Sequence, residues 1–287
     1  MDRFLSSRHF IGWALASPVA IVLALFLILP IIVIVVVSFW LATEFSIIPA
    51  FSWENYDFLL GSPVTVSVFL NTFKYAFITW ALTLGIGFTV AYFLAFHVRT
   101  LTWQIALFLI CTIPFWTSNI IRMISWIPFL GRNGIANSAL MSWGVVDEPL
   151  DWLLFSDFAV ILAFVHLYTL FMVVPIFNTM MRIDKSLIEA ARDAGASGAQ
   201  ILWNVIVPLT KPGIMIGTIF VVTLVMGDFV TVRIMSGSQS ANVGRLISND
   251  IGLLQYPSAS ATAVILLITV LITIGILLRF VDIRKEL

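Results

Sequence analysis

Few residues in this sequence have the types and spacing that catalysis or metal binding requires. Its three histidines, His9, His97 and His166, lie far apart, and no two of them have the i, i+3 or i+4 spacing of metal ligands on one helix. The sequence contains no Gly-x-x-x-x-Gly-Lys-Ser/Thr segment, whose backbone would cradle nucleotide phosphates. We therefore expect no catalytic residue, no metal site and no cofactor in this chain.

The composition indicates an all-α integral membrane protein. Hydrophobic residues make up 61% of the chain and charged residues 10%, whereas a soluble domain has about 25% charged residues. No basic run exceeds two residues, so nothing indicates nucleic-acid binding. The first apolar stretch, from Phe10 to Thr43, is longer than the roughly 7–15-residue core of a signal peptide, and we interpret it as a retained span.

Apolar stretches of about 20 residues, long enough to cross a bilayer as helices, predict six spans in a single domain of residues 1–287. The fifth is long enough only if it continues past Asp228 to about Ile234. The short segment 123–131 is expected to be interfacial or re-entrant. The predicted spans are about 11–41, 75–96, 101–121, 158–181, 212–234 and 257–278.

Asp228 and His166 are the polar residues of greatest interest within these spans. A charge at bilayer depth costs at least about 2.5–3.5 kcal/mol, so Asp228 should face a cavity or a partner, where its carboxylate would favour a cation. Two alternatives for Asp228 stay open, namely a place at the outer interface and an ion pair with Arg233. For His166 we expect a hydrogen bond across the helix bundle, with pore lining as the alternative.

The distribution of lysine and arginine predicts that both termini lie in the cytoplasm. With that orientation the inside segments hold ten basic residues, which are Arg3, Arg8, Arg99, Arg182, Lys185, Arg192, Lys211, Arg279, Arg284 and Lys285. The outside segments hold five, which are Lys74, Arg122, Arg132, Arg233 and Arg245. The segment 182–211 is then a cytoplasmic loop, and the tryptophan- and acid-containing loops 44–73 and 122–157 lie outside, as interface anchors or as a docking surface.

The segment 182–211 is predicted to hold two short helices. Ser186 and Glu189 have the spacing of a capping box, which satisfies backbone N–H groups of a first helical turn. Gly195 lies where that helix should end, because glycine tolerates positive φ. Ser197 and Gln200 repeat the capping box and start a second helix that should run to Pro208.

The first of these helices is too short to be stable alone in water. Its apolar positions are numerous for an exposed turn, and they are Leu187, Ile188, Ala190, Ala191 and Ala194. A partner surface would explain both facts. The alternative is a helix lying on the lipid headgroups.

The spacing of this segment resembles the EAA motif of binding-protein-dependent ABC importer permeases. The residues that carry the resemblance are Glu189, Ala190, Ala191, Gly195 and the run Val205–Pro208, with valines where the family prefers isoleucine or leucine. The resemblance implies a type I ABC importer permease with six transmembrane helices in the bacterial inner membrane. In that family the helix is a coupling helix seated in a groove of an ATPase subunit.

The same resemblance implies the partners. They are an ATPase dimer that binds the ATP, a second homologous permease and a periplasmic substrate-binding protein, with Glu189, Ala190, Ala191, Gly195 and Pro208 as the coupling residues. Further runs are similar to the first permease of spermidine/putrescine importers, which suggests polyamines as the substrate. These runs are Pro114–Arg122, Gly131–Asn137 and Leu187–Pro212.

Two other interpretations are weaker, and one packing question stays open. A secondary transporter should show inverted repeats or several buried ionisable residues, and a membrane-embedded enzyme should show paired carboxylates or a nucleophile with its base within the spans. Neither pattern is present.

Gly213 and Gly217 form a GxxxG pair that allows close helix packing, either with the second permease or within this chain.

Overall fold

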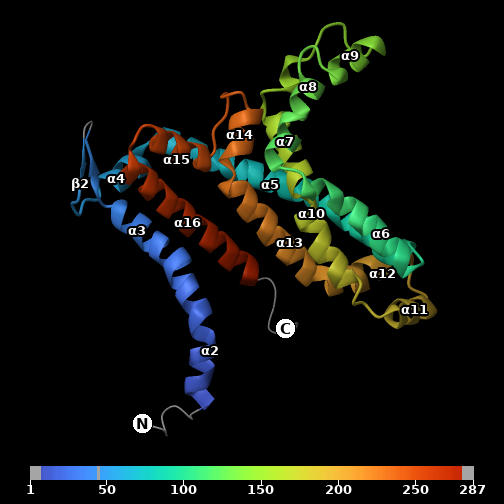
Figure 1. Cartoon of the computed structure of the whole chain (residues 1–287). Helices are drawn as coiled ribbons and strands as arrows, with labels where there is room; N and C mark the ends of the chain where they lie inside the picture. Colours follow the sequence, from blue (N-terminus) through green and yellow to red (C-terminus); the bar gives the residue numbers. More distant parts are fainter. Residues whose placement is uncertain (1–7, 44–45, 280–287) are drawn as a thin grey trace. The chain divides into compact units, whose positions relative to one another are not determined.

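The computed structural model describes residues 8–43 and 46–279, with side chains from residue 15 onward. Helices dominate the described chain, together with one two-stranded hairpin (Figure 1). The chain falls into two compact units, where the sequence predicts a single domain. Unit 1 is Met1–Ser62 with Ile247–Leu267, and unit 2 is Pro63–Leu246 with Ile268–Leu287. Arg3, Arg284 and Lys285, which enter the orientation argument, lie outside the described residues.

Unit 1 contains the first apolar span, a hairpin and a short helix, and it includes parts of α15 and α16. A π-helical stretch joins the two parts of the span. Its elements are α2 (Arg8–Leu23), η1 (Ala24–Ile28), α3 (Leu29–Val37), β1 (Leu41–Ala42), β2 (Ile47–Ile48) and α4 (Glu54–Gly61). In the hairpin, Leu41 pairs with Ile48 and Ala42 with Ile47. The span therefore ends at Val37, earlier than the predicted residue 41, because residues 41 and 42 are already in a strand.

Unit 2 contains the other long helices. In chain order they and their short companions are α5 (Pro63–Tyr92), η2 (Phe93–His97), α6 (Leu101–Thr112), η3 (Ile113–Trp116), α7 (Asn119–Ile124), α8 (Trp126–Leu130), α9 (Ile135–Ser142), η4 (Asp151–Leu153), α10 (Asp157–Met180), α11 (Lys185–Asp193), α12 (Gly198–Ile201), η5 (Leu202–Ile206), α13 (Val207–Gly227) and α14 (Phe229–Met235). The chain then continues through α15 (Val243–Gly252) and α16 (Tyr256–Arg279).

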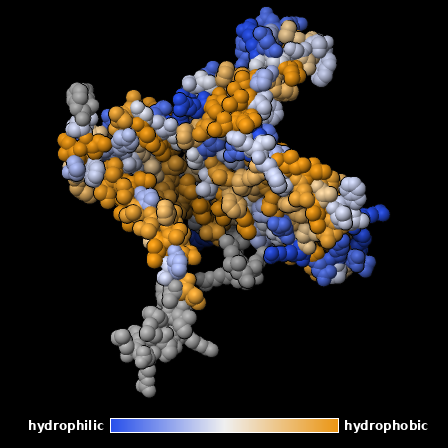
Figure 2. All heavy atoms as spheres, in the orientation of Figure 1, coloured by the Kyte–Doolittle hydropathy of each residue, from blue (hydrophilic) through white to orange (hydrophobic). Residues whose placement is uncertain are grey.

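Five helical segments of the described chain are long and apolar enough to cross a membrane, and a bent pair, Leu101–Trp116 with Asn119–Ser142, makes a possible sixth. Helices α10 and α16 lie within one residue of the predicted spans 158–181 and 257–278. In unit 2, hydrophobic residues cover the helices between hydrophilic groups near α11 and near α9 (Figure 2). Such an apolar belt is expected of helices that face lipid.

The second span begins twelve residues earlier than the predicted residue 75, since α5 starts at Pro63. Lys74 had marked the limit of the charge-free stretch. Its ammonium lies 2.7 Å from the Asp157 carboxylate, and the same carboxylate accepts hydrogen bonds from Tyr75 at 2.5 Å and Ser240 at 2.6 Å. A charge with such partners does not end a membrane helix. A search for charge-free stretches therefore placed the start of this span too late in the sequence.

The third span ends earlier than the predicted residue 121. The helix narrows to a 3₁₀ turn at Ile113–Trp116, and the following helices leave at a 90° bend. Pro114 lies in this turn and has no N–H to donate to the preceding turn, which explains why the α-helix stops there. Residues 117–121 therefore belong to the bend and to α7.

The fifth span differs most from the prediction of 212–234. Helix runs without interruption from Gly198 to Gly227, through Pro208 and Pro212, and it ends one residue before Asp228. The π-helical turn η5 precedes Pro208. A local change of helix type of this kind lets a helix accommodate a proline, which has no N–H to donate to the preceding turn. Pro208 consequently lies inside a long helix and does not end one, and Asp228 does not lie within a continuous helix.

Helix α10 is the centre of unit 2, packing against α5 and α13, which also pack against each other. Half of its apolar window is buried inside the chain, more than in any other described candidate span. The Trp80 indole of α5 donates to the Thr218 hydroxyl of α13 at 2.9 Å. This three-helix packing settles the GxxxG question, because a Cβ on Gly213 would lie 2.5 Å from the Pro175 carbonyl oxygen of α10.

The close approach at Gly213 predicts that Gly213→Ala destabilises the subunit. The added methyl would meet the α10 backbone, and overpacking of this kind costs about 1–3 kcal/mol. The control is Gly85→Ala, since no atom lies within 4 Å of a Cβ built there and alanine favours helix. Thermal unfolding of the detergent-purified complex should show a lower midpoint for Gly213→Ala alone. Equal midpoints would mean that α10 and α13 do not pack closely at this position.

Candidate functional site

The first helix of the 182–211 segment, α11, is capped by Asp184. Its carboxylate accepts the Ser186 backbone N–H at 2.9 Å, and this bond holds the pKa of the Asp184 carboxyl below its ordinary value. The predicted capping box of Ser186 with Glu189 is therefore wrong by two residues, because Ser186 lies inside the first turn. Aspartate is as good a cap as serine, and only the backbone conformation decided between them.

The end of α11 and the start of α12 follow the prediction. Gly195 has φ +85°, the Ala196 N–H donates to the Ala191 carbonyl, and the Gly195 N–H donates to that of Arg192. This is the double bond pattern of a Schellman motif, which needs a residue at positive φ. Ser197 and Gln200 form a complete capping box. The chain thus passes from α11 to α12 through only four residues, 194–197.

Helix α11 presents two different faces. Lys185, Ile188, Glu189 and Arg192 line a pocket of about 300 Å³ together with Tyr92, Phe96 and His97 of the second span and with Gly198, Ile201 and Ile206. On the opposite face Leu187, Ala190 and Ala194 are exposed, and no residue of α11 is buried. The helix is thus attached to its own chain by its polar side and leaves an apolar side free.

Asp228 lies at the break between α13 and α14 and caps the second helix. Its carboxylate accepts the Thr231 N–H at 3.0 Å, the Thr231 hydroxyl at 2.5 Å and the Tyr168 hydroxyl at 2.6 Å. Tyr168 is the twelfth of the 24 residues of α10, so Asp228 is held beside the middle of that helix and not beside its end. Among the described residues it forms no ion pair, and the predicted alternative of pairing with Arg233 is wrong.

His166 lies on the same helix, two residues before Tyr168. Its Nδ1 accepts a hydrogen bond from the Trp126 indole of α8 at 3.0 Å, and the two rings meet edge to face. The expected hydrogen bond across the bundle is therefore present. It attaches the bent segment after the third span to α10.

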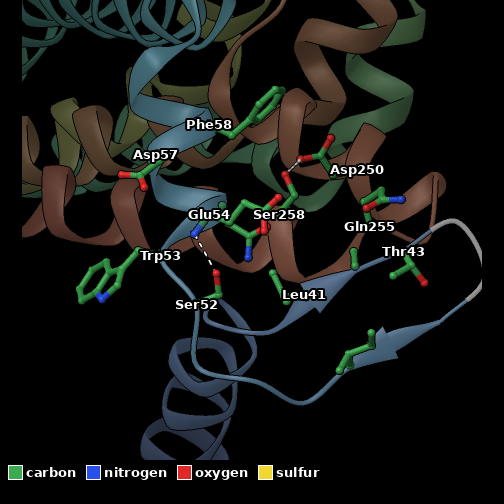
Figure 3. A pocket seen from close by; sticks show the side chains of 13 residues that line it. Leu41, Thr43, Ser52, Trp53, Glu54, Asp57, Phe58, Asp250, Gln255 and Ser258 are labelled. Carbon is green, nitrogen blue, oxygen red and sulfur yellow. Dashed lines mark hydrogen bonds between the residues drawn. The ribbon is translucent and has the colours of Figure 1, made fainter.

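A second pocket, of about 850 Å³, lies within unit 1. It is lined by the hairpin, by α4 and by the α15–α16 turn, and its charged lining residues are the carboxylates Glu54, Asp57 and Asp250. Figure 3 shows Asp250 beside Ser258 at one wall and Glu54 and Asp57 at the α4 wall. The Ser258 hydroxyl donates to Asp250 at 3.0 Å, while burial raises the pKa of the Asp250 carboxyl above its ordinary value.

Comparison with known proteins identifies the family. Residues 104–285 match the family described as "Binding-protein-dependent transport system inner membrane component". The chain belongs to this family. It is consequently a multi-pass protein of the inner membrane and a translocation subunit of a transport system, not an enzyme.

Its relatives include several permeases. The chain is 34% identical over 261 residues to the spermidine/putrescine transport system permease protein PotB of Escherichia coli K12, covering 89% of this chain and 91% of that protein. The PotB protein of Haemophilus influenzae is 32% identical, with 84% of each chain covered. The inner membrane ABC transporter permease protein YdcU of Escherichia coli is 24% identical and covers 82% of this chain and 77% of that protein.

Solved structures show the same fold. A chain in the crystal structure of a bacterial alginate ABC transporter in complex with an alginate pentasaccharide-bound periplasmic protein superposes with a TM-score of 0.78. It covers 97% of this chain and 96% of its own length at 15% identity. The fold of this permease is therefore the type I ABC importer fold expected from the EAA-like spacing.

Sequence reasoning missed three features of the permease. Arg122 is buried to 94%, since its relative exposure is 6%. Tyr168 is the partner of Asp228, and three carboxylates share the pocket of unit 1. The sequence gives one weak indication that Arg122 is buried, because this arginine stands alone between two apolar stretches. The other two had none, because the residues that meet are far apart in the sequence.

Proposed function

We propose that this permease, with a second homologous permease, forms the translocation path of an ATP-driven importer of spermidine, putrescine or a related polyamine. The observation that carries the proposal is α11, a capped helix with a free apolar face inside a chain of this family. The relatives named as spermidine/putrescine permeases, at 32–34% identity over most of the chain, support the substrate class.

In the proposed mechanism an ATPase dimer binds the ATP and α11 transmits its movement. Closure of the ATPases on ATP pushes the segment Glu189–Gly195, and the two permeases switch between inward- and outward-open states as rigid bodies. The pocket-lining face of α11 supplies the attachment that such a lever needs. The 2:1 bias of basic residues supports the orientation with α11 and both termini in the cytoplasm.

The coupling role predicts loss of transport without loss of the subunit. Ala190→Glu places a charge on the free face, and Gly195→Pro cannot adopt φ +85°, so both should reduce uptake by the reconstituted complex at least about tenfold, the effect of about 1.4 kcal/mol of lost coupling. Gly198→Ala is the control, because a Cβ there meets no atom within 4 Å. Uptake and co-purification of the ATPase are measured together.

The same experiment separates the two interpretations of the free face. If Ala190→Glu removes the ATPase from the purified complex, the face binds a protein. Full ATPase retention and normal uptake would favour a helix that rests on lipid headgroups and would exclude the coupling role.

Asp228 is proposed to line the cation path, because its carboxylate contacts the middle of α10 and a carboxylate within the helix bundle favours cations. Asp228→Asn should lower polyamine uptake about tenfold, the effect of removing one screened charge interaction, while it keeps the cap of α14, since asparagine also caps helices. Asp151→Asn, at an exposed carboxylate, is the matched control. Unchanged uptake and unchanged concentration dependence in Asp228→Asn would exclude this role.

The acidic pocket of unit 1 is proposed to receive basic side chains of the periplasmic binding protein. The first span ends just before the pocket residues, and the sixth span begins among them. With cytoplasmic termini, these two span ends, and the pocket with them, would be periplasmic. Three carboxylates with no basic residue among the lining residues favour a cationic partner.

This docking role predicts a salt-dependent effect. The variant Glu54→Gln/Asp57→Asn/Asp250→Asn should weaken stimulation of ATP hydrolysis by the loaded binding protein at least about threefold, because exposed ion pairs contribute about 0.2–1 kcal/mol each. The stimulation should also become less sensitive to ionic strength. Asp147→Asn/Glu148→Gln, which removes two carboxylates outside the pocket, is the control. An unchanged salt dependence in the triple variant would contradict the docking role.

A further inference from the structure

The pocket between α11 and the end of the second span combines basic groups with an apolar wall. Its volume is about 300 Å³. Two of its apolar lining residues, Ile201 and Ile206, are buried in the chain. From α11 it receives Lys185 and Arg192, which outnumber its one carboxylate, Glu189. The pocket is therefore amphipathic and carries an excess of positive charge.

The charged side chains of this pocket do not pair with one another. Lys185 and Glu189 have i, i+4 spacing, and Glu189 and Arg192 have i, i+3 spacing, at which ion pairs can form on a helix. Neither pair is formed, because both ion pairs of the described part of the chain lie elsewhere. The ammonium and the guanidinium can thus bind an anion that enters the pocket.

Two exposed tryptophans indicate that the pocket lies at the level of the lipid headgroups. Trp203, in η5 between the pocket residues Ile201 and Ile206, is 67% exposed, and Trp103 of α6 is 64% exposed. Exposed tryptophans of membrane proteins gather where hydrocarbon meets water. Figure 2 agrees, since it shows the hydrophilic residues around α11 at the edge of the hydrophobic surface of unit 2.

A hydrogen bond keeps Trp103 near the pocket. The side chain of the next residue, Gln104, donates to the Val98 carbonyl at 3.0 Å. Val98 directly follows the pocket residue His97.

Basic groups beside an apolar wall at this depth fit a ligand with an anionic head and an apolar body. Ammonium and guanidinium groups both bind phosphate. A free phosphate ion would use the basic groups alone, whereas a phospholipid would also cover the apolar wall. The excess of positive charge favours an acidic phospholipid over a zwitterionic one.

We propose that this pocket binds the phosphate headgroup of an acidic phospholipid, which fastens α11 to the end of the second span. The phosphate binds Lys185 and Arg192, and the glycerol and the first acyl carbons cover Ile201 and Ile206. The lipid occupies the face of α11 opposite its exposed apolar side, so it does not compete with a partner there. The site itself goes beyond the proposed function, while its effect on transport rests on the proposed coupling role of α11.

The binding test uses native mass spectrometry of the detergent-purified complex during titration with phosphatidylglycerol. Lys185→Gln/Arg192→Gln should weaken the tightest phosphatidylglycerol binding at least about tenfold, because each basic group near an anionic headgroup adds to the affinity. Lys185→Arg/Arg192→Lys keeps both charges and should stay within about threefold of the wild type. Arg182→Gln/Lys211→Gln is the matched control, since it removes two exposed basic residues outside the pocket, and it should leave this binding unchanged.

Two further titrations identify the ligand. Excess sodium phosphate should displace no more phosphatidylglycerol than sodium chloride of equal ionic strength, since the free ion makes no contact with the apolar wall. Displacement by phosphate alone would mean that the site takes a free anion, and it overturns the lipid proposal. Equally tight binding of phosphatidylcholine overturns it too, as does equal weakening in the pocket variant and the Arg182/Lys211 control.

Transport is measured with the same variants in liposomes of phosphatidylcholine, with and without phosphatidylglycerol. Phosphatidylglycerol should raise wild-type polyamine uptake at least about fivefold, the lower end of typical coupling between two sites. The rise should disappear in Lys185→Gln/Arg192→Gln and persist in the control. A pocket variant that loses the lipid but keeps the full rise overturns the fastening role. No wild-type uptake in either liposome overturns the proposed function instead, and the mass spectra then still decide the lipid site.

Discussion

The requirement that charges on or between the membrane helices have partners governs this structure. Asp157 meets it with Lys74 at 2.7 Å and with two hydroxyl groups, and these contacts join α5, the start of α10 and the chain after α14. Asp228 meets it with Tyr168 and Thr231. Because both carboxylates contact or belong to α10, the buried helix at the centre of unit 2 also organises the polar groups around it.

The candidate coupling segment depends on the same core. Helix α13 continues from α12 without a break for the 30 residues Gly198–Gly227, and it packs on α10 through Gly213 and Gly217. A displacement of α11 would therefore be carried along a stiff helix to its end beside Asp228. The Schellman turn at Gly195 ends α11 before that helix begins, and the apolar face of α11 remains exposed. In the proposed mechanism, force transmission and selectivity therefore lie at opposite ends of one helix.

How well the sequence predicts a feature of this protein depends on how far apart in the chain the interacting residues lie. Caps and turns are local, and Gly195 and the Ser197–Gln200 capping box are found where their spacing places them. The choice between Asp184 and Ser186 as the first cap failed, because both residue types cap helices. The span limits failed at Lys74, Pro114 and Pro208, where a distant partner or a local change of helix type decides whether the helix continues.

The sequence by itself determined a membrane protein through its composition and its long apolar stretches. The resemblance of the Glu189–Pro208 spacing to a family motif indicated the type of transport system and the segment proposed to couple it to an ATPase. Each of these depends on residues close together in the chain. Only the tertiary structure decided that Asp228 ends one helix and starts another, that Gly213 packs on α10 and that Arg122 is buried. Those features depend on hydrogen bonds and close packing between groups up to about a hundred positions apart, such as Met123 and Thr231 with a separation of 108, and no local pattern encodes them.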